Sequence, residues 1–244
     1  MRIKLTLDYI GTAYHGWQRQ DGLDTVQERV EAAVYALTGQ RSAVVASGRT
    51  DKGVHALAQV AHLDTDKALP PIKWRDGLNH YLPGDIRILD AAPVPETFHA
   101  IKNAKKKTYR YYMYGGASDR AVYRDRAVRV YGHMDIAAMD AAAKAFLGRH
   151  DFAAFKSMGS AVKTTVRTVY DARVFEENGL TVFSVTADGF LYNMVRLMAG
   201  VLMDAGKGRL KAADIAALID KKDKTVVHYV ASAHGLYLYA VEYE

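Results

Sequence analysis

Apolar and polar residues alternate along this chain in a pattern that predicts two successive passes of strands and helices. The first strand is expected at Arg2–Asp8, where every second residue is apolar, the period of a half-buried strand. A helix should follow Thr25, because Thr25 and Glu28 have the spacing of a capping box and apolar residues then recur at helical spacing up to Leu37. The pass is completed by strands predicted at Ala43–Ala46, Val54–Leu63 and Ile86–Leu89 and by a helix at Pro71–Tyr81 that begins with proline.

The second pass starts with a strand predicted at Thr108–Tyr114. Alternation places its side chains in two rows, with Tyr109, Tyr111 and Met113 on one side and Arg110, Tyr112 and Tyr114 on the other. One row should pack on a helix, so by pattern alone each of these tyrosines is expected in the core.

The rest of the second pass mixes helices with a hairpin. A helix capped by Asp135 should end at Gly148. A hairpin is predicted to turn at Glu177-Asn178-Gly179, because an Asn-Gly pair accepts the positive φ values of a tight turn. The other elements predicted are the hairpin strands Val166–Phe175 and Leu180–Ala187, helices from Phe190 to about Ala205 and at Lys211–Ile219, and a final strand at Gly235–Tyr243.

Strands and helices are mixed within each pass, and hairpin-like connections favour an α+β fold with antiparallel sheets. The 244 residues suit one large or two small domains, at roughly 100–200 residues per domain. We place the seam near Phe98–Lys107 and predict an N-terminal α+β half over residues 1–103 and a C-terminal α+β half over residues 104–244.

The chain contains no cysteine, which excludes disulfides, thiolate nucleophiles and cysteine-ligated metal sites and fits a reducing cytosol. Its first ten residues lack the apolar core of a signal peptide, and no apolar run approaches the roughly 18 residues that a membrane helix needs. We therefore expect a cytoplasmic protein with no membrane partner.

Basic residues are concentrated between Lys102 and Arg129, which we call the basic segment. It holds nine lysines and arginines against Asp119 and Asp125, a net charge of +7, whereas the whole chain carries +6, so the remainder sums to −1. Such a patch attracts polyanions through counterion release, although a solvated face could carry the same charge. The tyrosines interleaved with cations in this segment favour nucleic acid, since bases stack on aromatic rings.

Three kinds of catalytic or binding motif are missing from the sequence. No histidine pair has the spacing and flanking acids of a zinc site, and neither a phosphate-binding glycine loop nor a Gly-x-Ser-x-Gly motif occurs. Asp51, in the stretch SGRTDKGVHA (Ser47–Ala56), is the remaining candidate, because a carboxylate is ionised at neutral pH without an activating base. Arg49 would favour its charged form. A plain Asx-type surface turn is the commoner use of such a sequence.

Arg196 is the other unusual residue, since it lies within an apolar helical stretch, where a cation is costly unless it is paired. Its guanidinium could reach solvent past the apolar stem of the side chain. Alternatively it could pair with a buried acid, for which Asp51 is the candidate.

GRTDKGVHA resembles the Gly-Arg-Thr-Asp-x-Gly-Val-His-Ala signature of the tRNA pseudouridine synthase A (TruA) family. The similarity continues in order along nearly the whole chain, through Gly16–Gln20, Leu82–Ile86, Phe98–Ala100, Lys107–Tyr111, Gly148–Phe152, Phe190–Arg196 and Gly235–Leu236. The chain departs from the family pattern at Ile10, Ile101 and Ser232, where relatives often have Asp, Arg and Pro. Of these, Ile101 could weaken one phosphate contact.

The resemblance implies an isomerase that converts uridine to pseudouridine in the anticodon stem-loop of tRNA, at about positions 38–40, with no cofactor and no metal. By the same likeness, Asp51 would be the catalytic carboxylate and Tyr109 would stack on the target base. Arg196 would pair with Asp51, and Arg49 would help to hold the flipped nucleotide. Further RNA contacts are expected from the basic segment, at Lys105, Lys106, Lys107 and Arg110.

The resemblance also implies the fold and the assembly. The family fold consists of two ferredoxin-like halves whose antiparallel sheets join across a central catalytic cleft. Relatives are homodimers in which each RNA contacts both subunits.

Two other functions fit parts of the pattern. A non-catalytic RNA-binding or chaperone protein with the same basic, tyrosine-rich face would keep its function when Asp51 is replaced by asparagine. A carboxylate hydrolase such as a glycosidase would need a second acid in a suitable position, and no motif supplies an obvious one.

Overall fold

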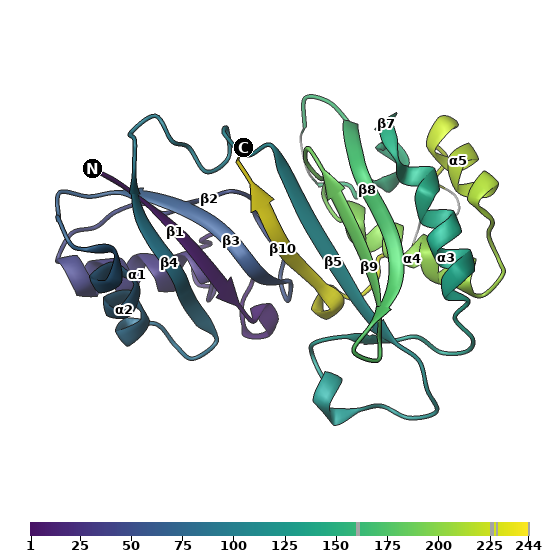
Figure 1. The fold of residues 1–244 in the computed structure, drawn as a ribbon, viewed down its shortest axis with the longest axis horizontal. Coiled ribbons are helices and arrows are strands. Elements are labelled where there is room, and N and C mark those ends of the chain that lie inside the picture. Colours follow the sequence, from purple (N-terminus) through teal and green to yellow (C-terminus); the bar gives the residue numbers. More distant parts are fainter. Residues whose placement is uncertain (160–161, 225–226, 228, 244) are drawn as a thin grey trace. The chain divides into compact units, whose positions relative to one another are not determined.

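The computed structural model describes residues 1–159, 162–224, 227 and 229–243 (Figure 1). The chain forms two compact units: the first consists of Met1–Lys105 and Tyr237–Glu244, and the second of Lys106–Leu236. The predicted split into residues 1–103 and 104–244 stays a prediction about domains.

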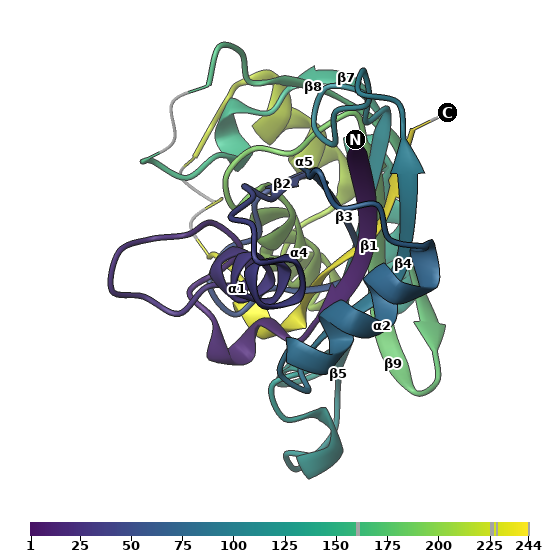
Figure 2. The ribbon, with the colours of Figure 1, turned by 90° about the vertical axis from the view of Figure 1, so that its left-hand side faces the viewer.

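The first unit is a βαββαβ arrangement on an antiparallel sheet. Its elements are β1 (Arg2–Tyr9), α1 (Val26–Thr38), β2 (Val45–Ala46), β3 (His55–Asp64), α2 (Pro71–Tyr81) and β4 (Ile86–Val94). The strands lie in the order β4-β1-β3-β2, and β1 is antiparallel to both of its neighbours. This is the ferredoxin-like order that the family resemblance implied. Helices α1 and α2 lie side by side on one face of the sheet (Figure 2).

A further strand, β10 (Leu236–Glu242), joins this sheet from the far end of the sequence. It pairs in parallel with the start of β3, where Tyr237 lies opposite His55. Strand β2 pairs further along the same edge of β3, at Ala61 and His62. One edge of β3 is therefore shared between two strands that lie almost two hundred residues apart in sequence.

The hydrophobic pattern explains the first unit well. Ile3, Leu5 and Leu7 are buried as the alternation predicted, and Tyr9 extends this buried row by one position. Helix α1 starts after Thr25, as expected, but the predicted capping box is wrong. The Thr25 hydroxyl is buried and makes no hydrogen bond within the described part of the chain.

The second unit also combines an antiparallel sheet with helices, but its elements follow a different order. Its elements are β5 (Lys106–Tyr114), β6 (Val128–Arg129), α3 (Ile136–Ala143), β7 (Gly148–Asp151), β8 (Val166–Glu177), β9 (Leu180–Ala187), α4 (Met194–Gly206) and α5 (Ala212–Asp220). The antiparallel sheet has the order β5-β9-β8-β7, and the short strand β6 pairs in parallel with β5. Helix α3 packs against β8, α4 and α5. The predicted α+β class with antiparallel sheets is confirmed, while the cleft between the halves stays a prediction.

Short 3-10 turns connect several of these elements. They lie at η1 (Gly11–Ala13), η2 (Ala121–Tyr123), η3 (Lys144–Phe146), η4 (Ala153–Phe155) and η5 (Ala233–Gly235). None of the helices in the described ranges is long and apolar enough to cross a membrane.

Two predicted helix boundaries in the second unit are wrong. Helix α3 ends at Ala143, and Gly148, at φ 102°, opens strand β7 instead of closing the helix, because Leu147 is already extended. Helix α4 begins at Met194 and not at Phe190, because Asn193 adopts a left-handed φ of 60° that an α-helix cannot contain. The predicted hairpin turn is confirmed, with Asn178 and Gly179 both at positive φ.

Candidate active site

The loop Ser47–Val54 joins β2 to β3 and carries the aspartate predicted from the sequence, so we call it the aspartate loop. Thr50 is buried, Asp51 is partly buried, and Arg49 and Lys52 are exposed. The Asp51 carbonyl accepts the Val54 N–H at 3.1 Å, which makes a tight turn directly after the aspartate. The loop therefore fixes the backbone around Asp51, a residue that remains partly exposed.

The segment Tyr14–Trp17 lies against the backbone of the aspartate loop. The Trp17 N–H donates to the Thr50 carbonyl at 3.0 Å, and the Gly53 N–H donates to the Tyr14 carbonyl at 3.4 Å. Gly16, at φ 88°, comes so close that a Cβ atom would lie 2.5 Å from the Thr50 carbonyl oxygen. Only glycine satisfies both the φ value and this approach. The Gly16-Trp17 motif thus supports the loop from outside it.

A buried polar network lies beneath the aspartate loop. The hydroxyls of Thr50 and Tyr9 are hydrogen-bonded at 2.7 Å, and Gln59 Nε2 donates to the Tyr9 hydroxyl at 3.4 Å. The Ser47 hydroxyl donates to Gln59 Oε1 at 2.7 Å, and Gln59 Nε2 donates to the Gly48 carbonyl at 2.8 Å. Burial raises the pKa of Tyr9 to about 12, so this phenol stays neutral at physiological pH. We call these five residues the Gln59 network.

His55, the first residue of β3, holds the other end of the loop. Its Nδ1 accepts the Gly11 N–H at 3.1 Å, and its buried ring stacks on Tyr237 with the centroids 4.5 Å apart. Gly11 lies so close to the chain here that a Cβ atom would overlap the Val54 carbonyl group. The histidine of the sequence motif therefore has a packing role.

In the second unit, Tyr109 lies on β5 opposite Val185 of β9. The residue is 8% exposed and its ring meets that of Phe190 edge-on, with the centroids 5.0 Å apart, so packing within the unit fixes the orientation of the ring. Tyr111 and Met113, on the same side of the strand, are fully buried, as the alternation predicted.

Arg196 lies in the first turn of α4, where its side chain is partly buried. Its Nε donates to the Ala231 carbonyl at 2.6 Å and its Nη1 donates to Asn193 Oδ1 at 2.9 Å. Asn193 in turn donates from Nδ2 to the Ser157 hydroxyl at 3.0 Å. These bonds anchor the guanidinium at the start of α4, and its pairing with Asp51 stays a prediction.

The three consecutive lysines of the basic segment have different surroundings. Lys105 is exposed. Lys106 Nζ lies 5.0 Å from the centroid of the Tyr170 ring, and burial lowers the pKa of Lys107. Their ammonium groups therefore differ in how readily they can reach an RNA phosphate.

Arg110, the fourth predicted RNA contact, already has an acidic partner. Its Nη1 lies 3.0 Å from Glu177 Oε2, and its guanidinium lies 5.6 Å from the centroid of the Phe175 ring. An RNA phosphate at this position would have to compete with the Glu177 carboxylate.

Each unit thus holds its own part of the predicted site. The first brings Arg49 and Asp51 together in one loop, and the second places Tyr109 on β5 and Arg196 on α4, which packs against β5. Across the described residues, no cluster of three or more histidines, aspartates or glutamates could hold a metal ion. The sequence reasoning missed Gln59, although a glutamine within a mainly apolar predicted strand was a signal that could have found it.

A family model described as tRNA pseudouridine synthase matches residues 6–102 and 142–244 of the chain. Curated relatives have similar lengths: tRNA pseudouridine synthase A of Acetivibrio thermocellus is 42% identical over 241 residues, with 99% of each chain covered. The protein of the same name from Caldicellulosiruptor bescii is 43% identical over 241 residues, again with 99% of each covered. That from Shouchella clausii is 43% identical over 244 residues, covering 99% of this chain and 93% of the relative. A solved structure titled "Crystal Structure of a Cbf5-Nop10-Gar1 Complex" matches with a TM-score of 0.32 and 13% sequence identity. The match covers 83% of this chain and 53% of that one, and no argument is based on so low a TM-score.

Proposed function

The chain belongs to the tRNA pseudouridine synthase family, and from this premise we propose that it isomerises uridines in the anticodon stem-loop of tRNA, at about positions 38–40. In this proposal Asp51 is the catalytic carboxylate. The aspartate loop carries the proposal, because it holds a partly exposed aspartate on a backbone fixed through Trp17, Gly53 and Thr50. The exposed cations Arg49 and Lys52 on either side suit a polyanionic substrate.

The chemistry needs a carboxylate and a place for a rotated base. The reaction breaks the bond between N1 of uracil and C1′ of the ribose, turns the base and rejoins it through C5, which releases the proton that C5 carried and leaves one on N1. A carboxylate is ionised at neutral pH, and Asp51 acts as the nucleophile or base that starts this exchange. A target nucleotide in a paired stem must first be extruded, at a cost of a few kcal/mol.

The other site residues bind and orient the extruded nucleotide. Tyr109 stacks on the target base, a role supported by the fixed orientation of its ring against Phe190. Arg196 pairs with Asp51, supported by the anchoring of its guanidinium at the start of α4. Arg49 holds the flipped nucleotide. The RNA backbone is contacted by Lys105, Lys106, Lys107 and Arg110.

We further propose, from the family resemblance alone, a cytoplasmic homodimer in which each tRNA contacts both subunits. Sedimentation of the purified protein with and without tRNA tests this assembly. A monomer at concentrations that give full activity would contradict it.

The catalytic assignment is tested by incubating the purified protein with unmodified tRNA transcripts. Pseudouridine should form with the wild-type protein and be lost with Asp51→Asn, while the Kd for tRNA changes by less than about tenfold, or 1.4 kcal/mol. Asp21→Asn, at an exposed aspartate of the same unit, is the matched control and should remain active. Undiminished product from Asp51→Asn would refute the assignment and favour the non-catalytic RNA-binding alternative.

A further inference from the structure

Gln59 is completely buried, yet its amide is hydrogen-bonded on both sides. The oxygen accepts from the Ser47 hydroxyl, and the nitrogen donates to the Gly48 carbonyl and, at longer range, to the Tyr9 hydroxyl. Since Tyr9 is bonded to Thr50, one side chain is connected to three residues of the aspartate loop.

The connection through Thr50 is the one nearest to Asp51 in the sequence. Thr50 directly precedes Asp51, and its side chain is tied to Tyr9 while its carbonyl is tied to the Trp17 N–H. The backbone at this position is therefore held from the core through the hydroxyl and from the neighbouring segment through the carbonyl. Releasing the hydroxyl leaves the residue before Asp51 with one of its two attachments.

The strand pairing beneath the loop is irregular at the same place. Leu7 lies opposite Gln59, but Tyr9, two residues later, lies opposite Ala56, so β3 has one extra residue between these two pairs. A bulge of this kind redirects side chains and is frequent next to active sites. It lies between the positions opposite Tyr9 and Leu7, the part of the sheet where Tyr9 and Gln59 meet.

We infer that the Gln59 network positions Asp51 for the reaction, with Gln59 and Tyr9 acting as positioning residues that need not touch the tRNA. This inference rests on the proposed function, since it assumes that Asp51 is catalytic. A misplacement of about 1 Å can lower a reaction rate about 100-fold. Loss of the network should therefore lower kcat and leave tRNA binding nearly unchanged.

The test compares variants that delete one hydroxyl each. Tyr9→Phe and Thr50→Val remove the two ends of the same hydrogen bond, and Thr50→Ser keeps the hydroxyl. The matched control is Thr38→Val, because Thr38 is also a buried threonine of this unit and its hydroxyl donates within α1, to the Val34 carbonyl at 2.7 Å. Melting temperature, the Kd for tRNA, and kcat and KM for pseudouridine formation are measured for each protein.

We expect kcat to fall about 10- to 100-fold in Tyr9→Phe and Thr50→Val, with KM and Kd within about threefold of wild type. Thr50→Ser should retain most of kcat, and Thr38→Val should keep the kcat of the wild type even if its melting temperature falls as far as that of Thr50→Val. Gln59→Met removes the amide that joins the network, so its kcat should fall at least as far as that of Tyr9→Phe. If Gln59→Met does not fold, the Tyr9 and Thr50 variants decide the question.

Three results would overturn the inference: kcat within twofold of wild type in both Tyr9→Phe and Thr50→Val, an equal loss in Thr50→Ser and Thr50→Val, or an equal loss in Thr38→Val and Thr50→Val. Asp51→Asn is assayed in parallel to separate the two proposals. If that variant still forms pseudouridine, the proposed function fails and this inference fails with it. If that variant is inactive while the network variants turn over normally, this inference fails alone.

Discussion

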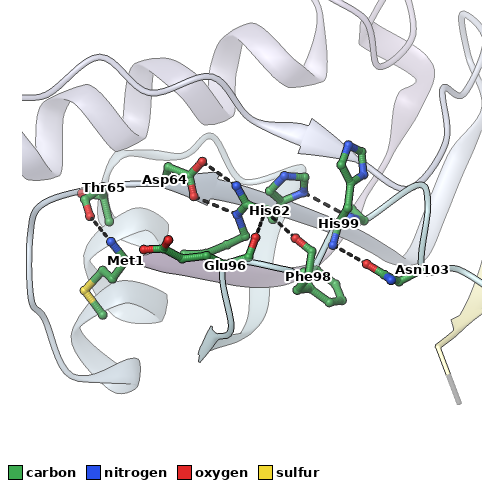
Figure 3. A network of polar contacts seen from close by, with 10 residues as sticks. Met1, His62, Asp64, Thr65, Glu96, Phe98, His99 and Asn103 are labelled. Atoms are coloured by element: carbon green, nitrogen blue, oxygen red, sulfur yellow. Dashed lines mark hydrogen bonds and ion pairs between the residues drawn. The ribbon is translucent and has the colours of Figure 1, made fainter.

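His62 is a single buried side chain that makes the stability of the first unit depend on pH. Its Nδ1 accepts the Ala100 N–H at 3.2 Å, and its ring lies 5.0 Å from that of His99 (Figure 3). Burial lowers the pKa of His62, and electrostatic interaction with Arg2 and His99 lowers it further, against weaker opposite effects of Asp64 and of a backbone hydrogen bond at Val45. Protonation at Nδ1 would also remove the acceptor for Ala100.

The sign of the pH effect follows from these contacts. Because the folded protein keeps His62 neutral where the unfolded chain already binds a proton, this stabilisation is lost as the pH falls below about 6.5, the pKa of an unperturbed histidine. We predict that the melting temperature of the wild-type protein falls between pH 7.5 and pH 5.5. The melting temperature of His62→Gln should fall less over the same range. Asp64, whose pKa Arg2 lowers, loses its contribution only near and below pH 4. An equal fall in both proteins would contradict the role of His62.

At the scale of single residues, the sequence predicted the proposed catalytic carboxylate better than the residues that hold its loop in place. Asp51 could be selected because the motif around it is specific. Gln59 could have been noticed as a polar residue in a mainly apolar strand, but the roles of Gln59 and Tyr9 could not be predicted. These roles depend on partners that folding brings together across 12 positions for Ser47 and Gln59 and 50 positions for Tyr9 and Gln59. Periodicity places such residues on a strand face but does not reveal which buried groups they meet.

Elements act on the site through their ends and through the segments packed against them. The segment around Gly16 shows this most directly, since it touches the aspartate loop through its backbone alone. Its close approach leaves no space for a side chain.

We predict that Gly16→Ala lowers pseudouridine formation at least about tenfold, because the new Cβ must displace the Thr50 carbonyl and with it Asp51. Gly22→Ala is the control, since Gly22 has a similar φ of 74° and no atom within 4 Å of the added Cβ. It should cost about 1 kcal/mol of stability and keep full activity. The comparison is made by activity assay and thermal unfolding. Equal activity of the two variants would show that the close approach does not control the loop.

Of the two helix N-caps predicted from the sequence, Asp135 makes its capping hydrogen bond and Thr25 does not. Mutations at these two positions should therefore change the stability of the protein differently. Asp135 accepts the Ala138 N–H at 2.9 Å, so Asp135→Ala should cost about 1 kcal/mol. Thr25→Val should leave stability unchanged or raise it by up to about 1 kcal/mol, because the Thr25 hydroxyl is buried with no partner among the residues described. Chemical denaturation measures both values. A loss above about 1 kcal/mol in Thr25→Val would show that this hydroxyl does cap α1.

The periodicity of apolar residues predicted the central parts of the helices and strands correctly. It predicted the ends of the helices less reliably. The predicted bounds of α2 are those observed, since a proline opens it and another follows shortly after its end. The starts of α1 and α3 were also found, but the box at Thr25 did not form and the first residue of α4 was missed. Both failures depend on local backbone angles and on competing partners, which spacing alone does not encode.

For the whole molecule, charge has the most direct bearing on the RNA partner. We predict that replacing Lys105, Lys106 and Lys107 with alanine weakens tRNA binding and lowers the slope of log Kd against log salt by about 1–2. Loss of three unhindered phosphate contacts would lower the slope by more than this. A smaller change is expected because Lys107 is partly buried and Lys106 already lies against Tyr170.

The control for this measurement removes the same charge elsewhere, at Lys67, Lys73 and Lys221, which are exposed and outside the basic segment. Its salt dependence should stay near that of the wild type. An unchanged slope in the first variant would mean that its lysines face away from the RNA, and equal changes in both would point to net charge alone.

The membership of β10 in the first unit could not be predicted from the sequence. Its alternation identified a strand, but nothing in the residues from Leu236 to Glu242 indicates that they pair with β3. Long-range partner choice depends on which edge remains open after the local hairpins have formed.

The pairing of β10 with β3 has a consequence for the order in which the protein matures. A ribosome makes β3 and the aspartate loop early, but Tyr237, which stacks on His55 beside that loop, emerges only after the entire second unit. A nascent chain therefore displays Asp51 before the support of His55 is complete. Competence to modify tRNA should accordingly be acquired at the end of translation, when the last strand reaches the first unit.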